Sequence, residues 1–155
     1  MSKKAKVSQT WLMIALSIAI LARIGLWVSY LPAHGNDTST YQHLANSLRN
    51  HQGFERYNGT RTPGYPFFLM ITGTEEQAYL VQLCLGVITS LLVYWVTWRL
   101  SEKHWLAGLL SLAHSLNLGQ LFFEAALLSE AVATFLFFAW LAGMVFLLNQ
   151  NKQKT

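Results

Sequence analysis

The amino-acid sequence predicts an all-α integral membrane protein with four transmembrane helices and a large outer loop, and three observations carry this prediction. First, 53% of the 155 residues are hydrophobic and 12% are charged, whereas an average soluble domain carries roughly 25% charged residues. Second, apolar runs of about 20 residues, the length that crosses a bilayer, recur along the chain. Third, all three prolines lie between the first two apolar runs, where no continuous helix is required.

The first predicted span covers residues 11–31 and contains a single charge, Arg23. The basic start of the chain resembles the n-region of a cleaved signal peptide, which is the alternative. However, the apolar stretch exceeds the roughly 7–15 residues of a signal-peptide core, and no small-residue cleavage pattern follows it. We therefore expect a retained helix.

Three further spans are predicted after a long polar interval. Residues 79–98 contain no charge and carry aromatic residues at both ends, where membrane interfaces favour them. Residues 105–123 form a weaker span, because polar residues in its second half must face protein or a water-filled cavity. These interruptions are His114, Asn117, Gly119 and Gln120. Residues 131–148 are uncharged and rich in Phe.

Basic residues outside the spans predict the orientation. Seven of them fall on one side of a four-helix path: Lys3, Lys4, Lys6, Arg99, Lys103, Lys152 and Lys154. The positive-inside rule assigns that side to the cytoplasm. The tails, 1–10 and 149–155, are then cytoplasmic, and the loop 32–78 is outside. We therefore expect residues 1–155 to form one membrane domain. Because the basic residues are explained by the orientation of the chain in the membrane, we expect no nucleic-acid partner.

The outer loop carries a predicted amphipathic helix at residues 38–52. Tyr41, Leu44, Ala45 and Leu48 recur at helical spacing and form one apolar face, which suits a helix lying along the membrane interface. The apolar stretch 65–71 is too short to span the bilayer. We expect it to re-enter the interface or to pack on the helices.

Four motifs in this order resemble a known family. They are D-x-x-x-Y-x-x-L-A-x-x-L at 37–48, R-x-P-G-Y-P-F-F at 61–68, Q-L-x-L-G at 82–86 and L-L-S-E at 127–130. This arrangement resembles the N-terminal part of the GT-C-fold membrane glycosyltransferases, in particular the protein O-mannosyltransferase and lipid A aminoarabinose transferase-like group. Each motif alone is degenerate, and the resemblance rests on their order and spacing over nearly the whole chain.

The resemblance implies transfer of a sugar from a polyprenyl-phosphate carrier to a lipid or protein acceptor at the outer face of a bacterial or archaeal cytoplasmic membrane. It implies that Asp37 is a catalytic base or metal contact and that Glu130 is a second acid of the site. Arg61 would lie near the carrier phosphate, with Arg23 as a further candidate. Such chemistry needs a general base and positive charge at the phosphate, and the two carboxylates suit Mg²⁺ or Mn²⁺.

Each of these residues also has an ordinary structural interpretation. Asp37 precedes a helix and is a suitable N-cap, and Glu130 in the first turn of the last span favours the helix dipole. Arg61 can bind lipid headgroups. Arg23 can snorkel or pair with an acid such as Glu130. Glu124 is interpreted as loop surface, with a second active-site acid as the alternative.

Two classes of function remain open. The first is a glycosyltransferase module that binds membrane lipid and a polyprenyl-phosphate sugar, in which Asp37 and Glu130 approach one another at the outer mouth of the bundle. The second is a non-catalytic scaffold or lipid-binding subunit derived from that fold. Members of the family that the chain resembles continue for several further spans. The enzyme hypothesis therefore includes a protein partner or a homo-oligomer that completes the site.

Overall fold

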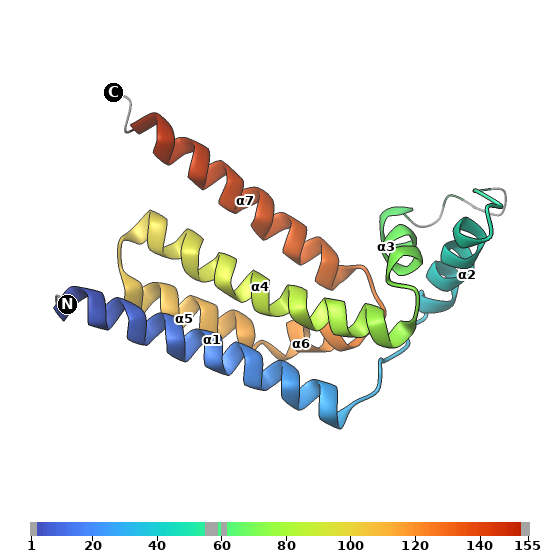
Figure 1. Cartoon of the computed structure of the whole chain (residues 1–155), viewed down its shortest axis with the longest axis horizontal. Coiled ribbons are helices and arrows are strands. Elements are labelled where there is room, and N and C mark those ends of the chain that lie inside the picture. Colours follow the sequence, from blue (N-terminus) through green and yellow to red (C-terminus); the bar gives the residue numbers. More distant parts are fainter. Residues whose placement is uncertain (1–2, 55–58, 60–61, 153–155) are drawn as a thin grey trace.

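The computed structural model describes residues 3–54, 59 and 62–152. This part of the chain folds into seven helices: α1 (Lys3–Ser29), α2 (Thr38–Arg49), α3 (Gly64–Thr72), α4 (Glu75–Ser101), α5 (His104–Ser115), α6 (Leu118–Ala125) and α7 (Glu130–Lys152). Helices α1, α4 and α5 pack side by side, and α7 packs on α4 (Figure 1). Helices α2 and α3 lie together at one end of this bundle, here called the α2–α3 end, and both chain termini lie at the opposite end (Figure 1).

Three helices are long and apolar enough to cross a membrane: Gln9–Ser29, Glu75–Ser101 and Glu130–Gln150. A fourth candidate is the pair α5 and α6, whose axes are bent by 52°. The prediction of an all-helical chain with long apolar helices is therefore confirmed. The weaker span predicted at 105–123 corresponds to this bent pair, in which the helix breaks after Ser115 and restarts as α6. Asn117 is the N-cap of α6, and its side chain accepts a hydrogen bond from the backbone N–H of Gln120.

Helix α4 begins four residues before the predicted second span. Thr74 and Gln77 form a capping box, in which each side chain accepts a hydrogen bond from the backbone N–H of the other residue. Such reciprocal caps satisfy backbone donors that a helix start would otherwise leave unpaired. At the other end, Glu102 adopts a left-handed conformation with φ of 57° and stops the helix before α5 begins.

Small and hydroxylated residues let α1, α4 and α5 approach closely, as expected when helices pack in a membrane. Ala15, Ala19 and Ala107 are buried, and a Cβ atom added at Gly108 would lie 2.7 Å from the Trp11 ring. Between α4 and α5, hydroxyl groups form hydrogen bonds across the interface. Ser111 Oγ donates to the Ser90 carbonyl at 2.7 Å, and the Ser115 and Ser90 hydroxyls are 2.8 Å apart.

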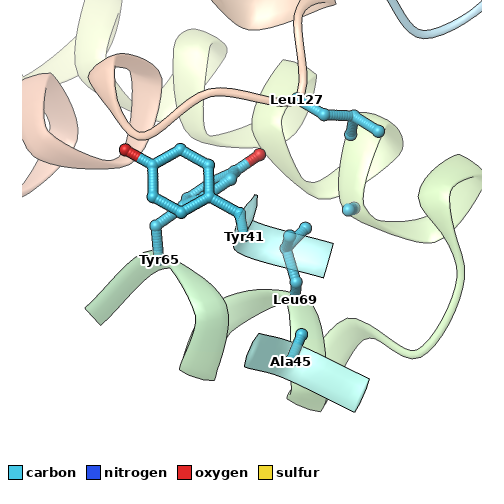
Figure 2. Close-up of a cluster of buried hydrophobic side chains, with 6 residues drawn as sticks. Tyr41, Ala45, Tyr65, Leu69 and Leu127 are labelled. Atoms are coloured by element: carbon cyan, nitrogen blue, oxygen red, sulfur yellow. The ribbon is translucent and has the colours of Figure 1, made fainter. Parts of the chain in front are cut away.

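The predicted amphipathic helix is present as α2, and its apolar face packs on α3. Figure 2 shows Tyr41 and Ala45 of α2 beside Tyr65 and Leu69 of α3, with Leu127 packed above them. The rings of Tyr41 and Tyr65 meet edge to face at 5.0 Å. The segment predicted at 65–71 is therefore helical and supports α2. Its packing against α2 and α4 agrees with the second of the two predicted alternatives.

Helix α2 ends at Arg49 rather than at 52, because the chain turns at the next two residues. The backbone N–H groups of Asn50 and His51 bond back into the helix, and His51 then adopts a positive φ of 58°. Arg49 joins the two short helices from this end. Its Nη2 donates to the carbonyls of Leu69 and Gly73, at 3.2 and 2.9 Å, and thereby caps the C-terminus of α3.

We expect opposite labelling of the two ends of the bundle in a Cys84→Ser background, which removes the exposed native thiol. A cysteine at His43, exposed on α2, should react with a membrane-impermeant maleimide from outside intact cells. A cysteine at Lys103, exposed between α4 and α5, should react only after permeabilisation, because the basic residues favour a cytoplasmic location. Labelling of both positions from the same side would contradict a four-span topology.

Candidate functional site

Two segments distant in the sequence are joined at the α2–α3 end. Ala33 and Ala126 form a parallel bridge, in which the Ala33 N–H donates to the Ala125 carbonyl and the Leu127 N–H donates to the Ala33 carbonyl, at 2.8 and 2.9 Å. Thr38 adds a third link, because its hydroxyl donates to the Leu127 carbonyl at 3.2 Å. The residues that precede α2 are thus fixed to those that precede α7. The bridge brings the start of α2 and the start of α7 to one end of the bundle.

Asp37 precedes this link by one residue and is half-buried. It occupies the N-cap position of α2 but has helical φ and ψ of −90° and −17°, and its side chain makes no capping hydrogen bond. An N-cap normally has an extended backbone and accepts a bond with its side chain. Helix capping therefore does not account for the carboxylate at this position.

Glu130 begins α7 and is exposed. It lies close enough to Tyr65 to act on its ionisation. The pKa of the Tyr65 phenol is raised far above its usual value, first by burial and then by Tyr41 and Glu130, so this hydroxyl stays protonated as a donor. It donates to Gln82 Oε1 at 2.6 Å. The carboxylate of Glu130 accepts a hydrogen bond from Ser129 Oγ at 3.4 Å, and this hydroxyl lies 3.4 Å from the Tyr41 hydroxyl, which places Glu130 beside the aromatic cluster of α2 and α3.

Glu130 also lines a cleft of about 420 Å³ between the α5–α6 break and α7, here called the polar cleft. Its lining residues are His114, Asn117, Gly119, Gln120, Phe123, Glu130, Ala133 and Thr134. Among the described residues, Asp37 does not line this cleft. The two acids share one end of the bundle, and one of them faces the polar cleft.

Arg23 pairs with Glu124, not with Glu130. Its Nε and Nη2 donate to the two carboxylate oxygens at 2.8 and 2.7 Å, and its Nη1 donates to the Ser115 carbonyl at 3.1 Å. Arg23 is 3% exposed and Glu124 is fully buried. The interpretation of Glu124 as loop surface is wrong, because its carboxylate points into the protein and neutralises Arg23 of α1. With all three nitrogens engaged in these bonds, Arg23 has no nitrogen directed at a phosphate.

Two residues of the Q-L-x-L-G motif surround this ion pair. Gln82 Nε2 donates to the carbonyls of Glu124 and Ala126, at 3.0 and 2.7 Å, and so satisfies backbone acceptors where the chain leaves α6. Gly86 lies one turn further along α4. A Cβ atom there would overlap the Glu124 carboxyl group. The motif therefore makes room for the buried acid and holds the segment that leads to Glu130.

Gly86→Ala is expected to destabilise the protein by about 1–3 kcal/mol, the usual range for an overpacked core, because the added methyl group overlaps the carboxylate that neutralises Arg23. Thermal unfolding in detergent measures the effect. Gly143→Ala is the matched control, since no atom lies within 4 Å of a Cβ added there. Equal stability of the two variants would contradict the close packing of Gly86 on Glu124.

The described residues do not provide the arginine that was predicted to bind the donor phosphate. Arg61 lies outside the described residues. Sequence reasoning missed Arg49, which lines a smaller cavity of about 270 Å³ with Gln42, Asn46 and Glu75 between α2, α3 and α4. Among the described residues, no group of three or more His, Cys, Asp or Glu side chains could hold a metal ion. The described residues therefore do not fit the expected Mg²⁺ or Mn²⁺ site.

An apolar groove of about 450 Å³ runs between α1 and α4. Its lining residues are Ile20, Arg23, Ile24, Trp27, Leu80, Leu83, Cys84, Val87 and Ile88. The groove lies along two helices that are long and apolar enough to cross a membrane. Its lining is suited to a hydrocarbon chain.

No protein-family model, curated protein or solved structure matches this chain. The class that the fold defines is an all-helical chain with three long apolar helices, or four if the bent pair α5 and α6 counts as one span.

Proposed function

We propose that this chain is a membrane glycosyltransferase module that binds a polyprenyl-phosphate-linked sugar at the outer membrane face and transfers the sugar to a hydroxyl acceptor. The observation that carries the proposal is the bridge between the segments that precede α2 and α7. It holds the segment of Asp37 through Thr38 and Leu127. Glu130 follows three residues later, so that two acids separated by 93 positions gather at one end of the bundle.

In this proposal Asp37 is the general base. Its carboxylate takes the proton of the acceptor hydroxyl while the acceptor oxygen bonds to the anomeric carbon. The bond between that carbon and the phosphate oxygen breaks, and polyprenyl phosphate leaves with the electron pair. Positive charge must stabilise the leaving phosphate, a role that the proposal gives to Arg61. Arg23 is excluded because Glu124 already neutralises it.

Two surfaces of the helix bundle support a lipid-borne donor, and Glu130 lines one of them. The apolar groove between α1 and α4 can take a hydrocarbon chain, and the polar cleft beside α7 offers polar side chains within candidate spanning segments. Polar groups within membrane-spanning segments are costly and commonly mark a functional site.

Native mass spectrometry of the protein from lipid nanodiscs tests donor binding. The proposal predicts that polyprenyl-phosphate mannose or polyprenyl-phosphate arabinose remains bound after a phospholipid with chains of comparable length has been stripped. Equal retention of the phospholipid and of both sugar lipids would instead support the non-catalytic lipid-binding subunit.

A further inference from the structure

The polar cleft is open to its surroundings and has the volume of a small-molecule site. Its volume of about 420 Å³ falls within the roughly 300–1,000 Å³ of typical ligand pockets. Its floor is the break between α5 and α6, where α6 restarts at an angle of 52°. Polar residues that would weaken a continuous span are thereby gathered on one wall, opposite the first turns of α7.

The side chains of the cleft favour a neutral, hydroxyl-rich ligand. The lining includes one carboxylate, two amides, one hydroxyl and one imidazole, and among the described residues neither Lys nor Arg contributes to it. A phosphate group would meet the carboxylate of Glu130 without a compensating cation, which is unfavourable. Sugar hydroxyl groups both donate and accept hydrogen bonds, and Phe123 adds an apolar surface for the face of a sugar ring.

Two amide side chains of the cleft are held in fixed positions. Gln120 Nε2 donates to Glu124 Oε1 at 3.0 Å, so that the buried ion pair fixes the orientation of this amide. Asn117 Oδ1 accepts the N–H of Gln120 at 3.0 Å as the cap of α6. These bonds use the nitrogen of one amide and the oxygen of the other. The oxygen and the second N–H of Gln120 and both N–H groups of Asn117 remain for a ligand, and together they can pair with adjacent hydroxyls.

His114 lines the cleft from α5, but its ring nitrogen Nε2 is turned into the protein. Its Nε2 is buried and has no hydrogen-bond partner within the described chain, while its ring packs against Phe138 of α7. A buried polar atom without a partner is unfavourable, and native proteins usually satisfy such atoms. Because this nitrogen is enclosed by the protein, a ligand in the cleft does not reach it, and His114 contributes other atoms of its ring to the lining.

We propose that the polar cleft binds the sugar ring of the donor and that the phosphate lies outside the cleft. This inference rests on the proposed function, because it takes the lipid-linked sugar as the ligand. It adds that recognition of the sugar comes from Gln120 and Asn117, with Thr134 and Glu130 on the facing helix.

Nuclear magnetic resonance of the protein in nanodiscs tests the assignment with three probes: polyprenyl-phosphate mannose, polyprenyl phosphate without a sugar, and an alkyl mannoside without a phosphate. The signals followed are the His114 imidazole nitrogens and the side-chain amides of Asn117 and Gln120. Both sugar-bearing probes should shift these signals, and polyprenyl phosphate alone should not. Equal shifts with polyprenyl phosphate would overturn the proposal in favour of a phosphate site.

The outcomes separate this inference from the proposed function. Retention of the sugar lipid in mass spectrometry without any shift of the cleft signals would overturn the inference and leave the proposed function standing. Failure of the protein to bind polyprenyl-phosphate mannose or arabinose would overturn both. The cleft signals could also shift without any probe when more protein is placed in each nanodisc. That result would show that a transmembrane helix of a second copy occupies the cleft, and it would also overturn the inference.

Thr134→Val provides a matched substitution, because valine keeps the shape and removes the hydroxyl. Affinity for polyprenyl-phosphate mannose should fall about three- to tenfold, the equivalent of one neutral hydrogen bond. Thr97→Val, near the opposite end of α4 and outside the lining, should leave the affinity unchanged. Equal affinities of the two variants would contradict a role of the Thr134 hydroxyl in the cleft.

Discussion

Glu124→Gln is expected to lower the free energy of unfolding by about 3–5 kcal/mol, the usual cost of removing one partner of a buried ion pair. The substitution keeps the size of the side chain but leaves the guanidinium of Arg23, which is 3% exposed, without its anion. No other acid is available to it among its hydrogen-bond partners in the described chain, which are Glu124 and the carbonyls of Ala19 and Ser115. Arg23→Met should cost a similar amount, because it leaves the carboxylate buried and unpaired.

A double-mutant cycle separates the pair from general effects on packing. Arg23→Met combined with Glu124→Gln removes both charges, so the double variant should recover much of the stability that either single variant loses. Equilibrium unfolding in mixed micelles measures all four proteins. Glu76→Gln, an exposed acid near the start of α4, is the control and should change the stability by less than about 0.5 kcal/mol. A coupling energy near zero would contradict the pairing of Arg23 with Glu124.

Asp37→Asn is expected to slow sugar transfer by about 10²–10⁴-fold, the usual contribution of a general base, while the protein remains folded. Asparagine and aspartate serve almost equally well as N-caps. The substitution therefore keeps a residue suited to the start of a helix and removes the negative charge with which Asp37 would take a proton. The measurements are the transfer rate from polyprenyl-phosphate mannose or arabinose and the free energy of unfolding of the same sample.

Glu76→Gln again serves as the matched control, since it neutralises an acid at the same end of the bundle and should leave the transfer rate unchanged. A wild-type rate for Asp37→Asn would show that Asp37 is not the base. A loss of stability equal to the loss of activity would instead assign Asp37 a structural role.

The features predicted best from the sequence depend on residues close together in the chain. The apolar face of α2 follows from the spacing of Tyr41, Leu44 and Ala45, and these three residues are buried. The long apolar helices follow from composition alone. The end of α2 was misjudged by three residues, because Arg49 and the turn after it depend on contacts with α3.

The features that were missed depend on contacts between distant segments. Glu124 is separated from Arg23 by 101 residues, and only the fold brings the two together. Two signals were nevertheless present in the sequence. A single arginine within an apolar span requires an acid, and Glu124 stands inside the apolar stretch L-F-F-E-A-A-L-L, where an acid on a loop surface is unusual. Gln82 and Gly86, four residues apart on one face of α4, form the surface against which Glu124 packs.

Phosphorus magnetic resonance tests the central claim most directly, with the protein extracted in polymer nanodiscs that retain any membrane partner. Polyprenyl-phosphate mannose and polyprenyl-phosphate arabinose are phosphodiesters, and loss of the sugar converts each of them to a phosphomonoester with a separate resonance. A glycosyltransferase module should convert at least one diester when an acceptor alcohol is present, and the Asp37→Asn variant should do so about 10²–10⁴ times more slowly. No conversion by the wild-type protein, or equal conversion by the two proteins, would contradict the account.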